Sequence, residues 1–207
     1  MGGVCVAGIG TEVGKTVVSA ILCEATGADY WKPVASGLED GPSDSEIVSS
    51  LIQDAVRRIH PSRYLFAKSL SPHIAAALEG VTIALSELHA PATERPLIVE
   101  LAGGVLVPLN DEHTNLDLIV RLGLPVVVVS RHYLGSINHT LLTLEVLRSR
   151  GATIRGVIFN GQELPDTERI IARHGRVEIL GRVPQLEELS AASVRSVAQS
   201  IAIGELS

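Results

Sequence analysis

The chain has 207 residues, of which 46% are hydrophobic and 19% are charged, so it can form one sizeable core and is far from a disordered composition. Its net charge of −6 and its 3% aromatic content argue against binding to nucleic acid or to an anionic membrane surface. Its longest apolar stretches are strand-length and fall short of the roughly 20 residues that cross a bilayer, so we expect a single domain over residues 1–207 in the cytoplasm.

Short apolar runs alternate with helical patterns along the chain. Several runs are β-branched and apolar at both odd and even positions, which is typical of parallel strands buried on both faces. The expected strands are residues 4–7, a second strand that ends at Lys32, and residues 97–101, 126–129, 154–159 and 177–183. The expected helices cover residues 15–24, 44–51, 71–78, 86–89, 115–122, 137–150, 166–174 and 190–202. This alternation predicts an α/β fold with a parallel sheet and helices on both of its faces.

Boundary residues support several of these helices. Candidate N-caps are Ser43, Thr114, Ser136 and Ser190, and glycines follow Arg150 and His174 where two helices are expected to end.

The strongest local signal follows the first strand, where the segment from Gly8 to Thr16 reads G-I-G-T-E-V-G-K-T and opens the first helix. Glycines let successive backbone N–H groups turn toward one anion, and the helix N-terminus adds partial positive charge. Lys15 would reach the β- and γ-phosphates of a nucleoside triphosphate, and the Thr16 hydroxyl would coordinate Mg²⁺. The spacing is unusual, because five residues separate Gly8 from Gly14 and Ile9 stands at the consensus first-glycine position. We therefore expect a sheet of the P-loop NTPase type.

A second lysine opens the segment K-P-V-A-S-G, from Lys32 to Gly37, at the end of the second strand. A cation there would neutralise charge that develops on a transferred phosphoryl group. The alternative is an exposed lysine ahead of a proline turn. The acidic stretch that follows, residues 37–42, is either a surface loop or a flap near the substrate.

Two carboxylates are candidates for a metal site together with Thr16. Glu100 comes at the end of an apolar strand in L-I-V-E-L-A-G-G, and Asp44 opens a helix directly after Ser43. With the Thr16 hydroxyl they would give Mg²⁺ a partial oxygen shell, completed by phosphate and water. Asp44 has the alternative of serving only as a capping acid.

The segment L-G-S-I-N-H-T, residues 134–140, opens a long helix after a strand. The free N–H groups of a helix start and a short amide side chain suit a carboxylate ligand. The alternative is that Ser136 simply caps the helix. We interpret His139 as structural rather than catalytic.

Together these motifs resemble the dethiobiotin synthase family. The resemblance is carried by the loop at residues 8–16, K-P-V-A-S-G at 32–37, S-D at 43–44, S-P-H-I at 71–74, V-E-x-A-G-G at 99–104 and L-G-S-I-N-H-T at 134–140. They come in the family's order over roughly residues 1–160. The resemblance implies an ATP- and Mg²⁺-dependent ligase of biotin biosynthesis. In that reaction 7,8-diaminononanoate takes up CO₂ as a carbamate, ATP phosphorylates the carbamate to a mixed anhydride, and the second amine closes the ureido ring, giving dethiobiotin, ADP and phosphate.

The resemblance also implies roles for individual residues. Thr11, Lys15 and Lys32 would surround the carbamate and γ-phosphate, with Ser36 near the substrate amines. Mg²⁺ would be held by Thr16, Asp44 and Glu100. The nucleotide site would comprise Gly10, Thr11, Glu12, Val13, Gly14, Lys15, Thr16, Val17 and Glu100, with Asn160 and Pro184 at the base. The substrate carboxylate would be received by Ser136, Ile137 and Asn138 of the neighbouring subunit, because family members are homodimers with the substrate at the interface.

One departure and two alternatives accompany this interpretation. Leu101 stands where the family has glycine after the metal glutamate, and we expect it to narrow the space near the γ-phosphate. A P-loop ATPase that positions other proteins would share the fold, but the lysine that such proteins often carry early in the loop is missing from Gly8–Gly10. A related ligase would carry the same loop with a different substrate pocket, and the L-G-S-I-N-H segment argues against it. The preferred nucleoside triphosphate stays open.

Overall fold

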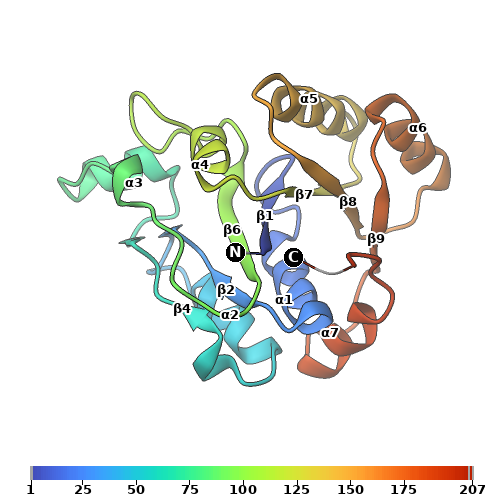
Figure 1. Cartoon of the computed structure of the whole chain (residues 1–207), viewed down its shortest axis with the longest axis horizontal. Coiled ribbons are helices and arrows are strands. Elements are labelled where there is room, and N and C mark those ends of the chain that lie inside the picture. Colours follow the sequence, from blue (N-terminus) through green and yellow to red (C-terminus); the bar gives the residue numbers. More distant parts are fainter. Residues whose placement is uncertain (1, 205, 207) are drawn as a thin grey trace.

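The computed structural model describes residues 2–204 and 206, which form an α/β domain around a seven-stranded parallel sheet (Figure 1). The strands are β1 (Gly3–Gly8), β2 (Asp29–Trp31), β3 (Val34–Ser36), β4 (Ile59–His60), β5 (Tyr64–Phe66), β6 (Leu97–Gly104), β7 (Val126–Arg131), β8 (Ile154–Asn160) and β9 (Ile179–Val183). The order across the large sheet is β4-β2-β6-β1-β7-β8-β9, and β3 and β5 form a separate parallel pair. The fold class predicted from the sequence is confirmed.

Helices cover both faces of this sheet. They are α1 (Lys15–Thr26), α2 (Asp44–Leu51), α3 (Pro72–Leu78), α4 (Asn115–Leu122), α5 (Ser136–Ser149), α6 (Pro165–Gly175) and α7 (Ala191–Ala198), with 3₁₀ turns at Ala55–Arg57 and Leu85–Glu87. Helices α1, α2 and α7 pack on one face, and α3, α4, α5 and α6 on the other (Figure 1). Successive strand residues alternate between the two cores, as the pleat requires: Val4 and Val6 face α1, whereas Cys5 and Ala7 face the opposite layer.

The central position of β1 determines where the candidate site lies. This strand is wholly buried and pairs in parallel with β6 on one side and β7 on the other. The carboxyl ends of parallel strands meet at one edge of a sheet, where ligands of open α/β folds bind. The segments after β1, β2, β6, β7, β8 and β9, which contain most of the predicted site residues, therefore emerge at the same edge.

Several boundaries differ from those expected, each for a local reason. The last helix ends at Ala198 and not at residue 202, because a turn at residues 199–200 follows it and the N–H of Ala202 bonds to the carbonyl of Leu180 in β9 at 2.7 Å, with Ile201 and Ile203 buried on either side. The expected helix at residues 86–89 is a 3₁₀ turn, and β9 begins at Ile179 rather than at residue 177.

Two of the proposed boundary signals were also wrong. Gly135, with φ of 102°, precedes the first residue of α5, so Ser136 is already inside the helix and is not its cap. Helix α6 includes Gly175 and ends on Arg176, which adopts the left-handed conformation with φ of 44°. Ser43, Thr114 and Ser190 do cap their helices. Among the described residues, no helix is long and apolar enough to cross a membrane.

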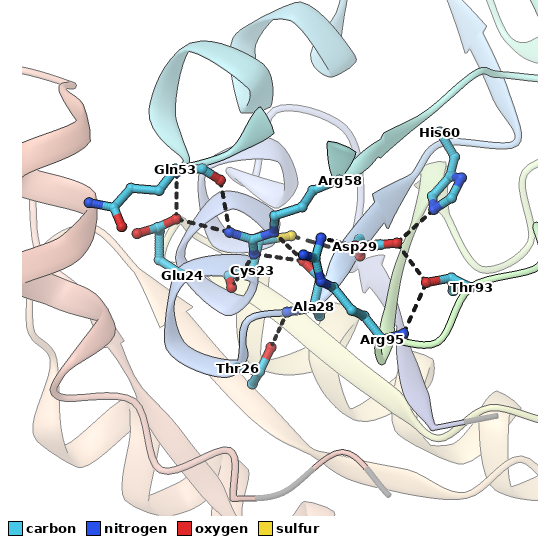
Figure 2. A network of polar contacts seen from close by, with 10 residues as sticks. All are labelled: Cys23, Glu24, Thr26, Ala28, Asp29, Gln53, Arg58, His60, Thr93 and Arg95. Carbon is cyan, nitrogen blue, oxygen red and sulfur yellow. Dashed lines mark hydrogen bonds and ion pairs between the residues drawn. The ribbon is translucent and has the colours of Figure 1, made fainter. Parts of the chain in front are cut away.

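The C-terminal end of α1 is held by the buried Arg58, which precedes β4 (Figure 2). Its guanidinium donates to the carbonyl of Ala28 from Nε at 3.0 Å and from Nη2 at 2.6 Å, and Nη2 also donates to the carbonyl of Cys23 at 2.6 Å. Nη1 donates to the carbonyl of Gln53 at 3.0 Å and lies 3.3 Å from Oε1 of Glu24, whose side chain is 7% exposed. A cation interacts favourably with the partial negative charge at the C-terminal end of a helix. Arg58 therefore stabilises the contact between α1, the helix that follows the glycine-rich loop, and the start of β4.

Candidate functional site

The glycine-rich loop joins the central strand β1 to α1. Gly14, with φ of 93°, is the N-cap of α1, and Glu12 adopts a left-handed φ of 55°. Lys15 is buried and folds back over the loop, where its Nζ donates to the carbonyl of Gly10 at 3.3 Å. Burial lowers the pKa of Lys15, and the neighbouring Lys32 lowers it further, against the opposing effect of Glu100 and Asp44. The loop thus carries a cation beside free helix N–H groups, the arrangement that binds phosphate.

The pleat of two neighbouring strands brings Lys32 beside Glu100. Strand β2 pairs with β6 in the register Tyr30 to Ile98, so Lys32, which directly follows β2, continues this register to Glu100 on the same face. Nζ of Lys32 lies 3.0 Å from Oε1 of Glu100, and both side chains are almost completely buried. The predicted exposed alternative for Lys32 is therefore wrong.

Two further residues complete this cluster from the helices above. Asp44, at the start of α2, forms an ion pair with Nζ of Lys32. The Thr16 hydroxyl of α1 lies 2.5 Å from Oδ1 of Asp44 and 3.0 Å from Oε1 of Glu100. The N-terminus of α2 is capped reciprocally by Ser43 and Glu46 rather than by Asp44. Asp44 therefore contacts Lys32 and Thr16 instead of capping α2 with its side chain, and the alternative that it is only a capping acid is wrong.

The opposite charges of Lys32 and its carboxylate neighbours stabilise each other's ionised form. Burial alone would lower the pKa of Lys32, but Glu100 and Asp44 outweigh it and the pKa is raised. Burial likewise opposes ionisation of Asp44, yet Lys32 and the Thr16 hydroxyl hold the pKa of that carboxyl below its usual value. Lys32 is therefore an ammonium and Asp44 a carboxylate at neutral pH.

The donor set matches a hard divalent cation. Thr16, Asp44 and Glu100 offer a hydroxyl and two carboxylates, all oxygen donors of the kind that Mg²⁺ prefers. The part of the chain that the structure describes contains no group of three or more His, Cys, Asp or Glu side chains placed to hold a metal. A cation here would consequently need oxygen ligands from phosphate or water to fill its shell.

One member of the cluster was missed by sequence reasoning. The hydroxyl of Tyr30, on β2, donates to Oε2 of Glu100 at 3.0 Å. The signal that could have identified it is its position two residues before Lys32, on the same face of the strand. Burial raises the pKa of Tyr30 well above its usual value and the charge of Glu100 raises it further, so the phenol stays protonated.

Leu101 does not act as expected. Its side chain is buried in the core on the face of the sheet opposite to α1, together with Val99, whereas Tyr30, Ile98 and Val6 form the core on the α1 side. Because neighbouring strand residues point to opposite faces, Leu101 and Glu100 diverge. The expectation that Leu101 narrows the space near the γ-phosphate is therefore wrong.

A groove of about 1190 Å³ brings together most of the residues expected at the base and at the substrate carboxylate. It is lined by Val17, Ser136, Ile137, Asn138, Asn160 and Pro184, among others. Nδ2 of Asn160 donates to the carbonyl of Val13 at 2.9 Å, and a Cβ on Gly14 would meet this nitrogen at 2.0 Å. Glycine is thus required where the Asn160 amide packs on the loop.

Thr11 and Ser36 lie outside both this groove and the cluster around Glu100. Thr11, exposed on the loop, lines a separate hollow of about 460 Å³ with Gly10 and with His139 of α5. The hydroxyl of Ser36 donates to the carbonyl of Leu70 at 3.0 Å. The loop after Ser36 continues the pairing of β3 with β5, since the N–H groups of Gly37 and Leu38 bond to the carbonyl of Phe66. Ser136, Ile137 and Asn138 thus lie in a different hollow from the loop residue Thr11 of the same chain.

Known proteins resemble this chain in sequence and in fold. The model of a family described as an AAA domain matches residues 2–193. A protein of Brucella ovis named ATP-dependent dethiobiotin synthetase BioD is 51% identical over 185 residues, which cover 89% of this chain and 87% of that protein. A protein of the same name from Brucella abortus is 50% identical over the same shares.

Two solved structures share the architecture. A ParA family ATPase from Chlorobium tepidum superposes with a TM-score of 0.57 at 14% identity, over 98% of this chain and 92% of that one. The cell division ATPase MinD of Pyrococcus furiosus also gives 0.57, at 16% identity, over 96% of this chain and 98% of that one. At such identities the likeness concerns the fold alone.

Proposed function

Because the chain belongs to the AAA-domain family and to the ATP-dependent dethiobiotin synthetases, we propose that it closes the cyclic urea of dethiobiotin in biotin biosynthesis. It is an ATP-dependent ligase that forms C–N bonds. Its substrates are 7,8-diaminononanoate, CO₂ and ATP, and its products are dethiobiotin, ADP and phosphate. The observation that carries the proposal is the cluster of the buried Lys32 and Glu100 with the partly buried Asp44 and Thr16, beside Lys15.

The electrostatics of the reaction match this cluster. A carbamate is a weak nucleophile, and it carries negative charge toward an anionic phosphate. Two lysines and a divalent cation would neutralise that encounter by charge and position rather than by acid–base chemistry. Lys15, Lys32 and Thr11 would contact the carbamate and the γ-phosphate, and Ser36 would contact the substrate amines. The ion pairs of Lys32 with Glu100 and Asp44 keep its ammonium charged and in place.

The nucleotide would lie along the loop and the groove. Residues 10–17 would bind its phosphates, and Asn160 and Pro184 would contact its base in the groove that they line. Thr16, Asp44 and Glu100 would hold Mg²⁺, which would shield the phosphate charges when bound.

We also propose that the enzyme is a cytoplasmic homodimer with the substrate at the subunit interface. Two observations support the dimer. Ser136, Ile137 and Asn138 line a groove that Lys32 and Ser36 of the same chain do not line. In addition, Leu134, which precedes α5, is fully exposed, and Leu142, in the middle of α5, is exposed, so this part of the chain presents apolar side chains to a partner.

The three lysines of the chain allow a matched test. The purified protein is incubated with ATP, Mg²⁺, bicarbonate and 7,8-diaminononanoate, and ADP and dethiobiotin are followed together by mass spectrometry. We expect one dethiobiotin per ADP. Lys32→Met should lower kcat/KM by roughly 100- to 1000-fold, the cost of removing one electrostatic stabiliser of the transition state. Lys68→Met is the control, because Lys68 is exposed and pairs only at the surface with Glu39.

Three results would decide the matter. ADP release that ignores the diamine would overturn the proposed reaction. Equal activity of Lys32→Met and Lys68→Met would show that Lys32 takes no part in catalysis, although the proposed reaction itself would still hold. A molecular mass of one chain at concentrations that give full activity, measured by light scattering, would exclude the dimer.

A further inference from the structure

The buried phenol of Tyr30 supports the Glu100 carboxylate through Oε2. Tyr30 and Glu100 are at most 1% exposed, and the Tyr30 hydroxyl donates to Oε2 of Glu100 at 3.0 Å. The ring belongs to the core between the sheet and α1, which fixes the hydroxyl in place. A rigid donor thus faces a carboxylate that would otherwise have one oxygen in an apolar environment.

The two oxygens of Glu100 consequently have different partners. Oε1 accepts from Lys32 Nζ at 3.0 Å and lies 3.0 Å from Thr16 Oγ1, whereas Oε2 accepts from the Tyr30 hydroxyl. The terminal torsion of a glutamate is soft by itself, so the carboxylate plane is set by its hydrogen bonds. The Tyr30 bond engages Oε2 and leaves Oε1 turned toward Thr16.

We propose that Tyr30 is a positioning residue that fixes Glu100 for the divalent cation accompanying the nucleotide. The proposal rests on the proposed function, because it assumes that Glu100 is a metal ligand. Partners that orient a ligating carboxylate typically change metal affinity by about 10- to 100-fold when they are removed. A tyrosine that merely filled the core would affect stability and leave metal affinity unchanged.

The first experiment measures binding, so it does not depend on turnover. ADP affinity is measured by calorimetry over a range of Mg²⁺ concentrations, and in EDTA, for the wild type and for Tyr30→Phe. We expect the half-saturating Mg²⁺ concentration to rise about tenfold or more in Tyr30→Phe, with ADP affinity in EDTA within twofold of the wild type. Tyr64→Phe is the control: Tyr64 also loses one hydrogen bond, from the N–H of Ala84 at 3.2 Å, but belongs to the separate β3–β5 pair.

The outcomes separate the two proposals. If the half-saturating Mg²⁺ concentration of Tyr30→Phe lies within twofold of that of Tyr64→Phe, the proposed role of Tyr30 is overturned, whatever the loss of thermal stability. A wild-type protein whose ADP binding ignored Mg²⁺ would count against the proposed metal site instead. In a Glu100→Gln background we expect Tyr30→Phe to change half-saturating Mg²⁺ by less than twofold. A full effect in that background would show that Tyr30 does not act through Glu100, and would also overturn the proposal.

A spectroscopic measurement covers the case in which Tyr30→Phe fails to fold. The chain has three tyrosines, so Tyr64→Phe combined with Tyr133→Phe leaves Tyr30 as the single one. With ¹³C-tyrosine labelling, its ring carbon bonded to oxygen gives one resonance that reports the hydrogen bond to Glu100. We expect this resonance to move when Mg²⁺ is added to the ADP complex and to stay when Mg²⁺ is added without ADP. An unmoved resonance in the complex would overturn the role of Tyr30.

Discussion

Replacement of Arg58 by methionine tests how firmly the helix behind the phosphate loop is held. Arg58 and Glu24 are both less than a tenth exposed, and the guanidinium satisfies backbone carbonyls of Cys23, Ala28 and Gln53 as well as the carboxylate (Figure 2). Methionine keeps much of the apolar stem, so the loss is concentrated in these polar contacts. Removing one partner of a buried ion pair costs about 3–5 kcal/mol, because the other charge is left without compensation.

This magnitude converts into a measurable shift of the melting temperature. For a chain of 207 residues, each kcal/mol moves Tm by about 2–4 °C, so Arg58→Met should lower Tm by roughly 6–20 °C. Urea unfolding followed by far-ultraviolet circular dichroism gives the free energy directly. The neighbouring Arg57 is exposed, and Arg57→Met should stay within about 0.5 kcal/mol of the wild type. If the two variants unfold at the same urea concentration, Arg58 does not stabilise the end of α1 and the reasoning fails.

Two other predictions concern stability. Asp117 accepts from the N–H of Thr114 and pairs with Arg150, and these contacts lower its pKa to about 2, so its contribution is present above about pH 4 and is lost as the pH falls toward 2. Asp117→Asn should cost about 1–2 kcal/mol at pH 7, allowing for partial exposure, and the gap between its urea midpoint and that of the wild type should shrink by pH 3; a constant gap would contradict this. Leu101→Ala should cost about 2–5 kcal/mol by leaving a cavity in the α4 layer, with KM for ATP within twofold; a large change in KM with unchanged stability would return Leu101 to the phosphate site.

Much of the fold could be predicted because local signals agreed with the final packing. The bounds of α2 and α4 match the expected residues 44–51 and 115–122, and both helices carry reciprocal capping boxes that are readable in the sequence. The short pair β3 and β5 was not predicted, since three residues give no periodicity to read. The overextended last helix failed for another reason: Ile201 and Ile203 are apolar because they cover the sheet, and helical spacing cannot distinguish this.

The candidate site was predictable wherever a motif carried it. Lys15, Thr16 and Lys32 lie in recognisable segments, and the structure brings them together with Asp44 and Glu100. The position of Tyr30 two residues before Lys32 was a signal, but its contact with Glu100 depends on the register between β2 and β6, strands that are far apart in the sequence. Strand alternation alone predicts that the Leu101 side chain points to the face opposite Glu100. The prediction was wrong because it considered only the position of Leu101 in the motif and not the alternation of side chains along the strand.

The central position of β1 has a consequence for the order of events during protein synthesis. Strand β1 is made first, yet its two partners are β6 and β7, so it waits until Arg131 has been added. At roughly 5–20 residues per second, that wait lasts roughly 6–25 s. Until β6 has been made, a run of valine, cysteine and alanine that ends up fully buried has no strand to pair with, and such segments are prone to aggregate. The glycine-rich loop, which follows β1, is thus made well before the two strands that hold β1 in place.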